Sequence, residues 1–515
     1  MFSLGGVNSY LRVAVDLYGE NTMAEQESDF IKIGTEAVCE VDEQLNVTLT
    51  KAKYGAKAFS VSRSMLKKMH CYFRGRTRSG KTSRLIIPIA QQLIQIWRAI
   101  TTTLVAPYGD NDERQDCVVF IDMGGDISLF RTAKSESEAH GRKFRFFSLD
   151  IEHDWCWFDP FQALAASSRT ALAVSEYLIA ALSVEYGLAY GASYFSMANL
   201  STLLAAAQEM EKTGKPFCLK NAVEAVEKKS KKDGEQIRMM LNVLLQITQL
   251  QEVEGRECID FARAIEDGET IYFWLPSLVG ANSARQIAGL ALYGVVAAAK
   301  ERTEQGKADR HTFVFCDEFQ EIAGRGFSSL LAQSAKYGVT FLLANQTSDQ
   351  LKNRDLDLTS IVSDNTGLKV LFTVTTQSDL DALQLFSMDE IATLKSDSTK
   401  QADLFGAMSE REYVRPKLQK NVVLEVSARE GFAFGILDDG ESFREPTPIW
   451  LDYGLTQEVH AEKYTIPTRI FDEIVTKPVA GVHAPYIPEW QRDYSEDEAW
   501  QARQQKLAAI WETES

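Results

Sequence analysis

The sequence predicts an α/β protein with a mostly parallel sheet and an inserted all-α domain. Short runs rich in β-branched and aromatic residues alternate with longer stretches of helical spacing, which is the pattern of a parallel sheet covered by helices. These runs are CVVFID, KFRFFSLD, TIYFWLP, TFVFCDE, VTFLLANQ and GLKVLFTV. Between residues 160 and 268 such runs give way to Ala-, Leu- and Met-rich segments whose apolar residues recur every three or four positions, which indicates helices.

Composition sets the broad class of the protein. The chain has 515 residues, of which 45% are hydrophobic, enough for two or three globular domains. The formal net charge of −17 means that any nucleic-acid contact has to be a local basic patch. No apolar run approaches the roughly 20 residues that span a bilayer, and the first residues lack the pattern of a secretory signal. We therefore expect a cytoplasmic protein with reduced cysteines.

Changes in composition suggest four regions. The predicted regions are an N-terminal part that could form a small sheet (1–65), a nucleotide-binding core in two pieces (66–160 and 269–455), an inserted all-α domain (161–268), and an acidic and aromatic C-terminal arm with a short helix (456–515).

The most informative motif is the stretch FRGRTRSGKTSRLIIP, which contains the pattern Gly-x-x-x-x-Gly-Lys-Thr just before an apolar helical run. In a loop of this kind, closely spaced backbone N–H groups and the dipole of the following helix hold phosphates, and the lysine reaches the β- and γ-phosphates. The nucleotide-binding candidates are Gly75, Arg76, Thr77, Arg78, Ser79, Gly80, Lys81, Thr82 and Ser83. We expect ATP as ligand, with the Thr82 hydroxyl on Mg²⁺; an accidental match of a loop is the alternative.

Two acidic residues follow a buried-strand pattern in TFVFCDEFQEIAG. Asp317 is expected to hold Mg²⁺ through water, and Glu318 to accept a proton from the attacking water as general base. Paired acids after a strand can also be an ordinary helix cap. Together with a phosphate-binding loop, the catalytic interpretation is preferred.

The next strand pattern ends in Asn345 and Gln346, where an amide could sense the γ-phosphate or orient water. We assign this role to Gln346, so that the predicted catalytic set is Glu318, Lys81 and Gln346. A polar strand end without a function would look the same in sequence.

These motifs resemble those of the type IV secretion coupling proteins of bacterial conjugation, over about residues 70–440. The resemblance includes the phosphate-binding loop with Pro88, the strand and turn in VVFIDMGGDISLF, and above all the block CDEFQEIAGRGFSSLLAQSAKYGVTFLLANQTSDQL. It implies a RecA-like ATPase core, a homo-oligomeric ring (a hexamer in this family), single- or double-stranded DNA as cargo, including relaxase-bound DNA, and components of a type IV secretion channel as partners.

Three departures from the family pattern affect what the resemblance implies. The family's two transmembrane helices have no counterpart, so any place at the inner membrane would depend on a partner. Ala335, followed by Lys336, replaces an arginine that is a candidate trans-acting finger. A lysine ammonium lacks the planar pair of donors with which an arginine guanidinium binds phosphate, so it fits this role less well. Met123 and Gly124 replace the proline and lysine of an Asp-Pro-Lys-Gly-Glu element.

The sequence is therefore compatible with two functions. The first is an ATP-hydrolysing motor that moves DNA or a nucleoprotein into a conjugative or type IV secretion apparatus. The second is a non-motor nucleotide switch or adaptor that recruits protein or DNA to such an apparatus. The basic run from Lys228 to Arg238 is the candidate DNA contact, although a solvated helix face is the explanation that we favour for it.

Overall fold

A computed structural model describes most of the chain, and all described residues belong to one compact unit within Met1–Pro467. The described residues are 30–42, 46–51, 57–95, 116–163, 170–182, 192–229, 234–276, 280–307, 310–352, 357–374, 376–397, 408–438, 440 and 443–452. The predicted C-terminal arm (456–515) lies outside them.

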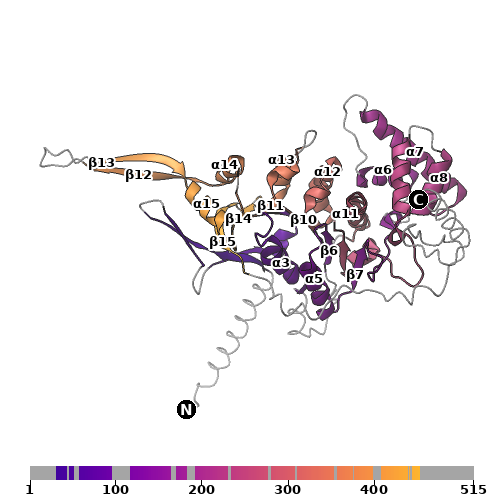
Figure 1. The fold of residues 1–515 in the computed structure, drawn as a ribbon, viewed down its shortest axis with the longest axis horizontal. Helices are drawn as coiled ribbons and strands as arrows, with labels where there is room; N and C mark the ends of the chain where they lie inside the picture. The colour runs from indigo at the N-terminus through magenta and orange to yellow at the C-terminus, as the bar shows by residue number, and fades with distance from the viewer. Residues whose placement is uncertain are drawn as a thin grey trace, which may run out of the picture. The chain divides into compact units, whose positions relative to one another are not determined.

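The centre of the fold is an 11-stranded sheet with a parallel and an antiparallel part (Figure 1). The parallel part runs in the order β11 (Thr366–Leu371), β5 (His70–Arg74), β10 (Val339–Asn345), β9 (Thr312–Asp317), β6 (Cys117–Asp122), β8 (Thr270–Trp274), β7 (Phe144–Ser148). Beyond β11 follow the antiparallel strands β14 (Phe432–Asp438), β15 (Phe443–Trp450), β1 (Phe30–Glu36) and β4 (Ala58–Ser62). The predicted α/β fold with a mostly parallel sheet is thus confirmed.

Helices cover both faces of the sheet, which explains why the parallel strands are apolar along their whole length. Alternate residues of β6 show this: Val118 and Phe120 pack with α3 (Ile87–Gln95) and α5 (Ile127–Ala139), whereas Val119 and Ile121 belong to the core on the opposite face. The opposite face is covered by α11 (Ala281–Glu304), α12 (Arg325–Ser334) and α13 (Thr359–Asn365) (Figure 1).

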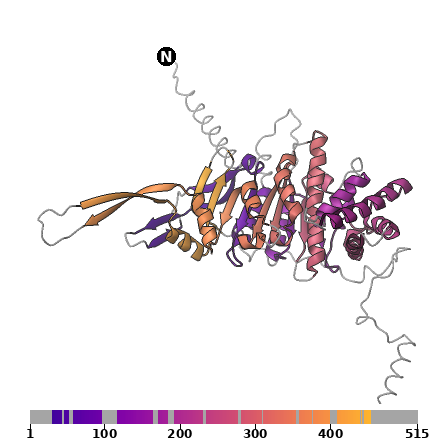
Figure 2. The ribbon, with the colours of Figure 1, turned by 90° about the horizontal axis from the view of Figure 1, so that it is seen from above.

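Between β7 and β8 the described chain is helical. The helices are α6 (Ala171–Ala181), α7 (Ala192–Thr213), α8 (Leu219–Lys229), α9 (Glu235–Leu245) and α10 (Phe261–Asp267), and most of them gather on the far side of α11 from the central strands (Figure 2). Side chains connect them: the Glu211 carboxylate accepts a hydrogen bond from the Ala171 N–H at 2.7 Å, and Asn199 donates to Gln236 at 3.1 Å.

The N-terminal part contributes to more than one sheet. The segment VCEVDEQLNVTLT contains β2 (Val38–Val41) and β3 (Val47–Thr50), which pair as a separate antiparallel sheet, whereas β1 and β4 extend the large sheet. Between β11 and β14 the chain forms α14 (Gln377–Leu385), the hairpin β12 (Asp389–Asp397) and β13 (Met408–Pro416), and α15 (Lys420–Ala428). Within the described ranges, no helix has the length and apolar character to cross a membrane.

Candidate nucleotide-binding site

The glycine-rich loop joins β5 to a helix at the carboxyl end of the parallel strands. A Cβ atom on Gly75 would lie 2.4 Å from the Ser79 Oγ and 3.0 Å from the Phe372 Cβ, so a larger residue here would require these neighbours to shift. Gly80 has φ +88°, in the left-handed region that favours glycine. A first turn of π type (η1, Lys81–Ile86) follows directly and continues into α3. The loop is therefore compact and opens onto the N-terminus of a helix.

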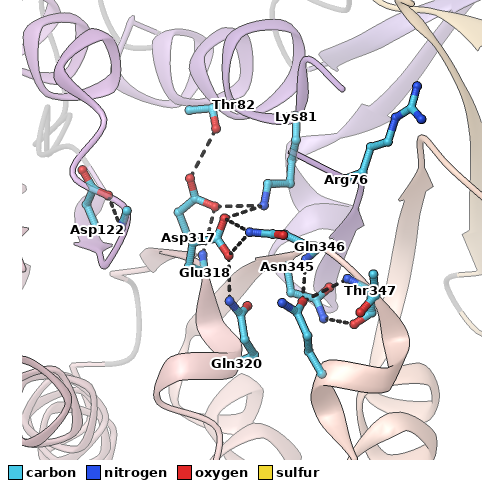
Figure 3. Close-up of polar contacts among 12 residues, drawn as sticks. Arg76, Lys81, Thr82, Asp122, Asp317, Glu318, Gln320, Asn345, Gln346 and Thr347 are labelled. Carbon is cyan, nitrogen blue, oxygen red and sulfur yellow. Dashed lines mark hydrogen bonds and ion pairs between the residues drawn. The ribbon is translucent and has the colours of Figure 1, made fainter. Parts of the chain in front are cut away.

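The acidic pair at the end of β9 faces the lysine of this loop (Figure 3). The Nζ of Lys81 lies 3.3 Å from Oδ1 of Asp317 and 3.5 Å from Oε1 of Glu318. Lys81 is buried, with 7% of its surface exposed, and so is Asp317. The two carboxylates are therefore the counter-ions of Lys81 in this structure.

Glu318 is held by a second pair of contacts besides Lys81. The Nε2 of Gln346 donates to both carboxylate oxygens at 3.2 Å, and the Nε2 of Gln320 donates to Oε2 at 2.7 Å. Its backbone has φ 53° and ψ 43°, a left-handed conformation that is costly for a residue with a side chain. Its side chain caps no helix, so the cap interpretation of this acid receives no support from the geometry.

Asp317 and Thr82 form a donor set that suits Mg²⁺. The Thr82 hydroxyl donates to Oδ2 of Asp317 at 3.3 Å. Burial raises the pKa of Asp317, the Lys81 ammonium opposes this, and the neighbouring Glu318 adds to it. A hydroxyl and a carboxylate beside the candidate phosphate-binding loop fit this ion, which commonly takes one or two protein oxygens and fills its other positions with water and phosphate. In the described part of the chain, no three His, Cys, Asp or Glu side chains form a metal-binding group.

The two amides predicted at the end of β10 have different environments. Gln346 points to Glu318, whereas the Nδ2 of Asn345 donates to the Thr347 carbonyl at 2.8 Å and its side chain is fully buried. Because β10 lies between β5 and β9, Gln346 lies between the loop and the acidic pair. Asn345 shapes the turn and Gln346 faces the site (Figure 3).

The other predicted loop residues lie around the mouth of the site. Arg76, Thr77 and Arg78 are exposed, whereas Ser79, Thr82 and Ser83 are half-buried. The Arg76 N–H donates to the Thr373 hydroxyl at 3.3 Å, which ties the loop to the end of β11. The structure thus gathers Lys81, Thr82, Asp317, Glu318 and Gln346, and leaves the two arginines at the rim.

Asp122 is a third carboxyl beside the acidic pair, and the set of site residues predicted from the motifs did not include it. Asp122 ends β6 in register with Asp317. Its Oδ1 accepts from the N–H groups of Gly124 (3.0 Å) and Gly125 (2.8 Å), and its Oδ2 accepts from the Asp126 N–H (2.8 Å) and the Tyr272 hydroxyl (2.7 Å). Burial and the neighbouring Asp317 raise the pKa of Asp122 to about 7.

We expect the stability of the protein to carry a signature of Asp122. The folded state keeps a proton on this group that the unfolded chain releases near its ordinary pKa, so the stabilisation is present at low pH and is lost as the pH rises toward about 7. Asp122→Asn should remove this pH dependence. When the melting temperatures of the wild type and the variant are measured between about pH 5 and pH 8, their difference should therefore change with pH. Parallel curves of melting temperature against pH would contradict the assignment.

Comparing the wild type with Asp122→Asn also cancels contributions of opposite sign to the pH dependence of stability. Burial lowers the pKa of His70 to about 4 and that of His311 to about 3, so each stabilises more as the pH rises through the acid range. Both histidines are present in the wild type and in Asp122→Asn, and their effects cancel in the difference. Burial and Asp317 raise the pKa of Asp122, whereas the Tyr272 hydroxyl and the backbone N–H groups of Gly125 and Asp126 lower it.

Solved structures share this architecture. The bacterial conjugative coupling protein TrwBdeltaN70, in an unbound form, superposes with a TM-score of 0.54, covering 80% of this chain and 90% of its own, at 11% identity. The fold is that of TrwB. TrwB with a non-hydrolysable ATP analogue gives a TM-score of 0.51 with 76% and 87% of the chains covered, and TrwB with ADP and Mg²⁺ gives 0.50 with 82% and 94%, both at 12% identity.

The TrwB match confirms the expected RecA-like arrangement, because it extends over most of both chains. No protein-family model matches the sequence, and no curated protein does either. At 11–12% identity, the likeness to TrwB concerns the fold, and the chemistry has to be argued from the residues of this chain.

Proposed function

We propose that the protein is an ATP-hydrolysing motor that moves DNA, or DNA with bound protein, into a conjugative or type IV secretion apparatus. The observation that carries the proposal is the meeting of Lys81, Asp317, Glu318 and Gln346 at the mouth of a compact glycine-rich loop. A lysine, a metal-binding acid, a base and a polar sensor are the parts that phosphoryl transfer requires.

In this proposal each residue has one task. The backbone of the loop and Lys81 bind the phosphates, while Thr82 and Asp317 hold Mg²⁺, which neutralises charge on the β- and γ-phosphates when bound. Glu318 accepts a proton from water as the water oxygen attacks the γ-phosphorus, and the bond from that phosphorus to the β,γ-bridging oxygen breaks, so that ADP and phosphate are the products. Gln346 orients that water or senses the phosphate. Binding of phosphate takes Lys81 away from the two carboxylates, which leaves Glu318 free to act as a base.

The assembly and its cargo are also part of the proposal. TrwB is described in its structures as a bacterial conjugative and plasmid coupling protein, and this supports a related role for a chain with the same fold. We propose a homo-oligomeric ring, six-fold by analogy, with residues 66–160 and 269–455 as the motor core and 161–268 as the inserted domain. We place the protein in the cytoplasm or at the inner membrane through a partner, with secretion-channel components as partners.

A non-motor switch or adaptor is the second candidate, because Ala335, with the exposed Lys336 beside it, takes the place of the expected arginine. ATP hydrolysis by the full chain, measured with and without single- or double-stranded DNA, separates the two. DNA should stimulate a motor, whereas a switch should hydrolyse slowly under both conditions. Slow, DNA-independent turnover together with tight ATP binding would replace the motor proposal by the switch.

We expect the ring to assemble when ATP and DNA are present. Nucleotide that binds between subunits stabilises the assembly by mass action, so light scattering should show a larger species as the ATP concentration rises. DNA held through its phosphates should dissociate steeply as salt increases, despite the net charge of −17. A monomer under every condition, or DNA binding that is insensitive to salt, would contradict this prediction.

A further inference from the structure

We propose that Trp450, with Lys51 and Glu430, binds the base and ribose of the nucleotide whose phosphates the loop holds. This inference rests on the proposed nucleotide-binding function and concerns a part of the site that no motif in the sequence indicates. It starts from the order of the strands at the edge that carries the loop.

The catalytic residues occupy only one side of the loop. Asp317 and Glu318 follow β9, which is two strands from β5 with β10 between them. On the other side of β5 come β11, β14 and β15. A nucleotide with its terminal phosphate near Glu318 and its β-phosphate in the loop therefore directs its base toward β14 and β15.

The ends of these two strands lie at the correct edge of the sheet. The antiparallel strand β14 pairs Phe434 with Leu371, and Leu371 pairs with Arg74, the residue just before the loop. The start of β14 and the end of β15, which pair through Phe432 and Trp450, thus continue the edge formed by the carboxyl ends of β11 and β5. Trp450 and the loop share one rim of the sheet.

A single buried arginine connects the loop to this tryptophan. A Cβ on Gly80 would lie 2.8 Å from the Cδ of Arg84, so the Arg84 side chain passes directly beside the loop. Its Nη1 donates to the Leu451 carbonyl at 3.0 Å, and its Nη2 donates to the Glu430 carboxylate at 2.9 Å. The guanidinium carbon lies 5.3 Å from the centre of the Trp450 ring. The Arg84 side chain therefore lies between the loop and the edge that carries Trp450.

The indole ring also leans from β15 toward the loop. A Cβ on Gly431, just before β14, would lie 2.7 Å from the Cζ3 of Trp450, so the ring rests against the glycine backbone. The indole N–H donates to Asp452 at 2.7 Å, and Phe432 contacts the ring edge-to-face at 4.9 Å between centroids. The orientation of the ring is fixed by these neighbours.

The surroundings of Trp450 suit a nucleoside. The ammonium of Lys51, an exposed residue, lies 3.7 Å from the ring centre, so a side chain that can move lies over one face of the ring. An aromatic base can stack in its place, and the displaced cation can turn to the phosphates. The Glu430 carboxylate, 66% exposed, can accept hydrogen bonds from ribose hydroxyls.

These groups recognise the face of a base and not its edge. Stacking favours the larger purine rings and does not separate adenine from guanine, which differ at their edges. We therefore expect ATP and GTP to bind alike, and both more tightly than CTP.

Isothermal titration of the full chain with Mg²⁺ and ATP, GTP, CTP or inorganic tripolyphosphate tests this, in a Glu318→Gln background that prevents turnover. Loss of one aromatic stacking partner weakens the affinity for a nucleotide by roughly tenfold. Trp450→Ala should weaken ATP and GTP by about that factor and leave tripolyphosphate unchanged, whereas Trp450→Phe should restore most of the affinity. Equal loss for tripolyphosphate and ATP would show that Trp450 only braces the fold, and an unchanged ATP affinity would place the base elsewhere.

A second measurement uses the wild-type protein, so its result does not depend on whether a variant folds. Photolabelling with 8-azido-ATP should mark the peptides that contain Lys51, Glu430 or Trp450, in a manner that ATP suppresses. ATP-suppressible labelling confined to other peptides would overturn the proposal. If the wild-type protein binds neither ATP nor tripolyphosphate, the proposed phosphate site itself is wrong. If it binds both with equal affinity, the phosphate site stands and only the proposed base contact is wrong.

Discussion

Replacing Lys81 with alanine should reduce ATP hydrolysis by more than about a hundredfold and weaken ATP binding strongly. Lys81 is the only ammonium that the structure brings to Asp317 and Glu318 in the described part of the chain, and it is the group that we propose to bind the β- and γ-phosphates. Steady-state hydrolysis and titration with ATP measure the two effects.

The control for this variant is Lys300→Ala, which removes an exposed lysine of α11 whose ammonium pairs with Glu304 and not with the acidic pair. Lys81→Ala also leaves two neighbouring carboxylates without their counter-ion, so its melting temperature has to be compared with that of the wild type. A folded Lys81→Ala protein that hydrolyses ATP at the wild-type rate would remove the phosphate-loop assignment.

Glu318→Gln should separate binding from chemistry. The amide keeps the shape of the side chain but cannot accept the proton of the attacking water, so we expect hydrolysis to fall by about 10²- to 10⁴-fold while ATP binding persists. Glu321→Gln is a matched control, because Glu321 lies in the same turn but its carboxylate contacts Arg285 and not Lys81. Equal hydrolysis by the two variants would mean that the base is another residue.

The local motifs of this chain are readable in the sequence because their spacing is fixed by the backbone. The loop residues are consecutive, and Glu318 directly follows the apolar strand that ends in Asp317, so their types and order predict the chemistry. Parallel strands bring their carboxyl ends to one edge, and this places Gln346 near Glu318 without any further information.

Contacts between distant parts of the chain could not be predicted in this way. The Tyr272 hydroxyl reaches Asp122 across 150 positions, and Arg84 reaches the Leu451 carbonyl across 367. Nothing in the local pattern of either segment names its partner. Strand β15 was also hidden, because the prolines in FREPTPIW argue against a strand within a sheet.

The pairing of β1 with β15 has a consequence for how the protein is made. Thr35 pairs with Trp450, so one rung of the sheet joins residues from opposite ends of the described chain. A ribosome adds roughly 5–20 residues per second, so tens of seconds separate the two halves of this rung during synthesis. Over that interval β1 has β4 but not β15 as a pairing partner, and the rim that carries Trp450 is the last part of the described sheet to be synthesised. A nascent chain stalled before residue 443 should accordingly be more open to proteolysis than the finished protein, even though its phosphate loop has long been translated.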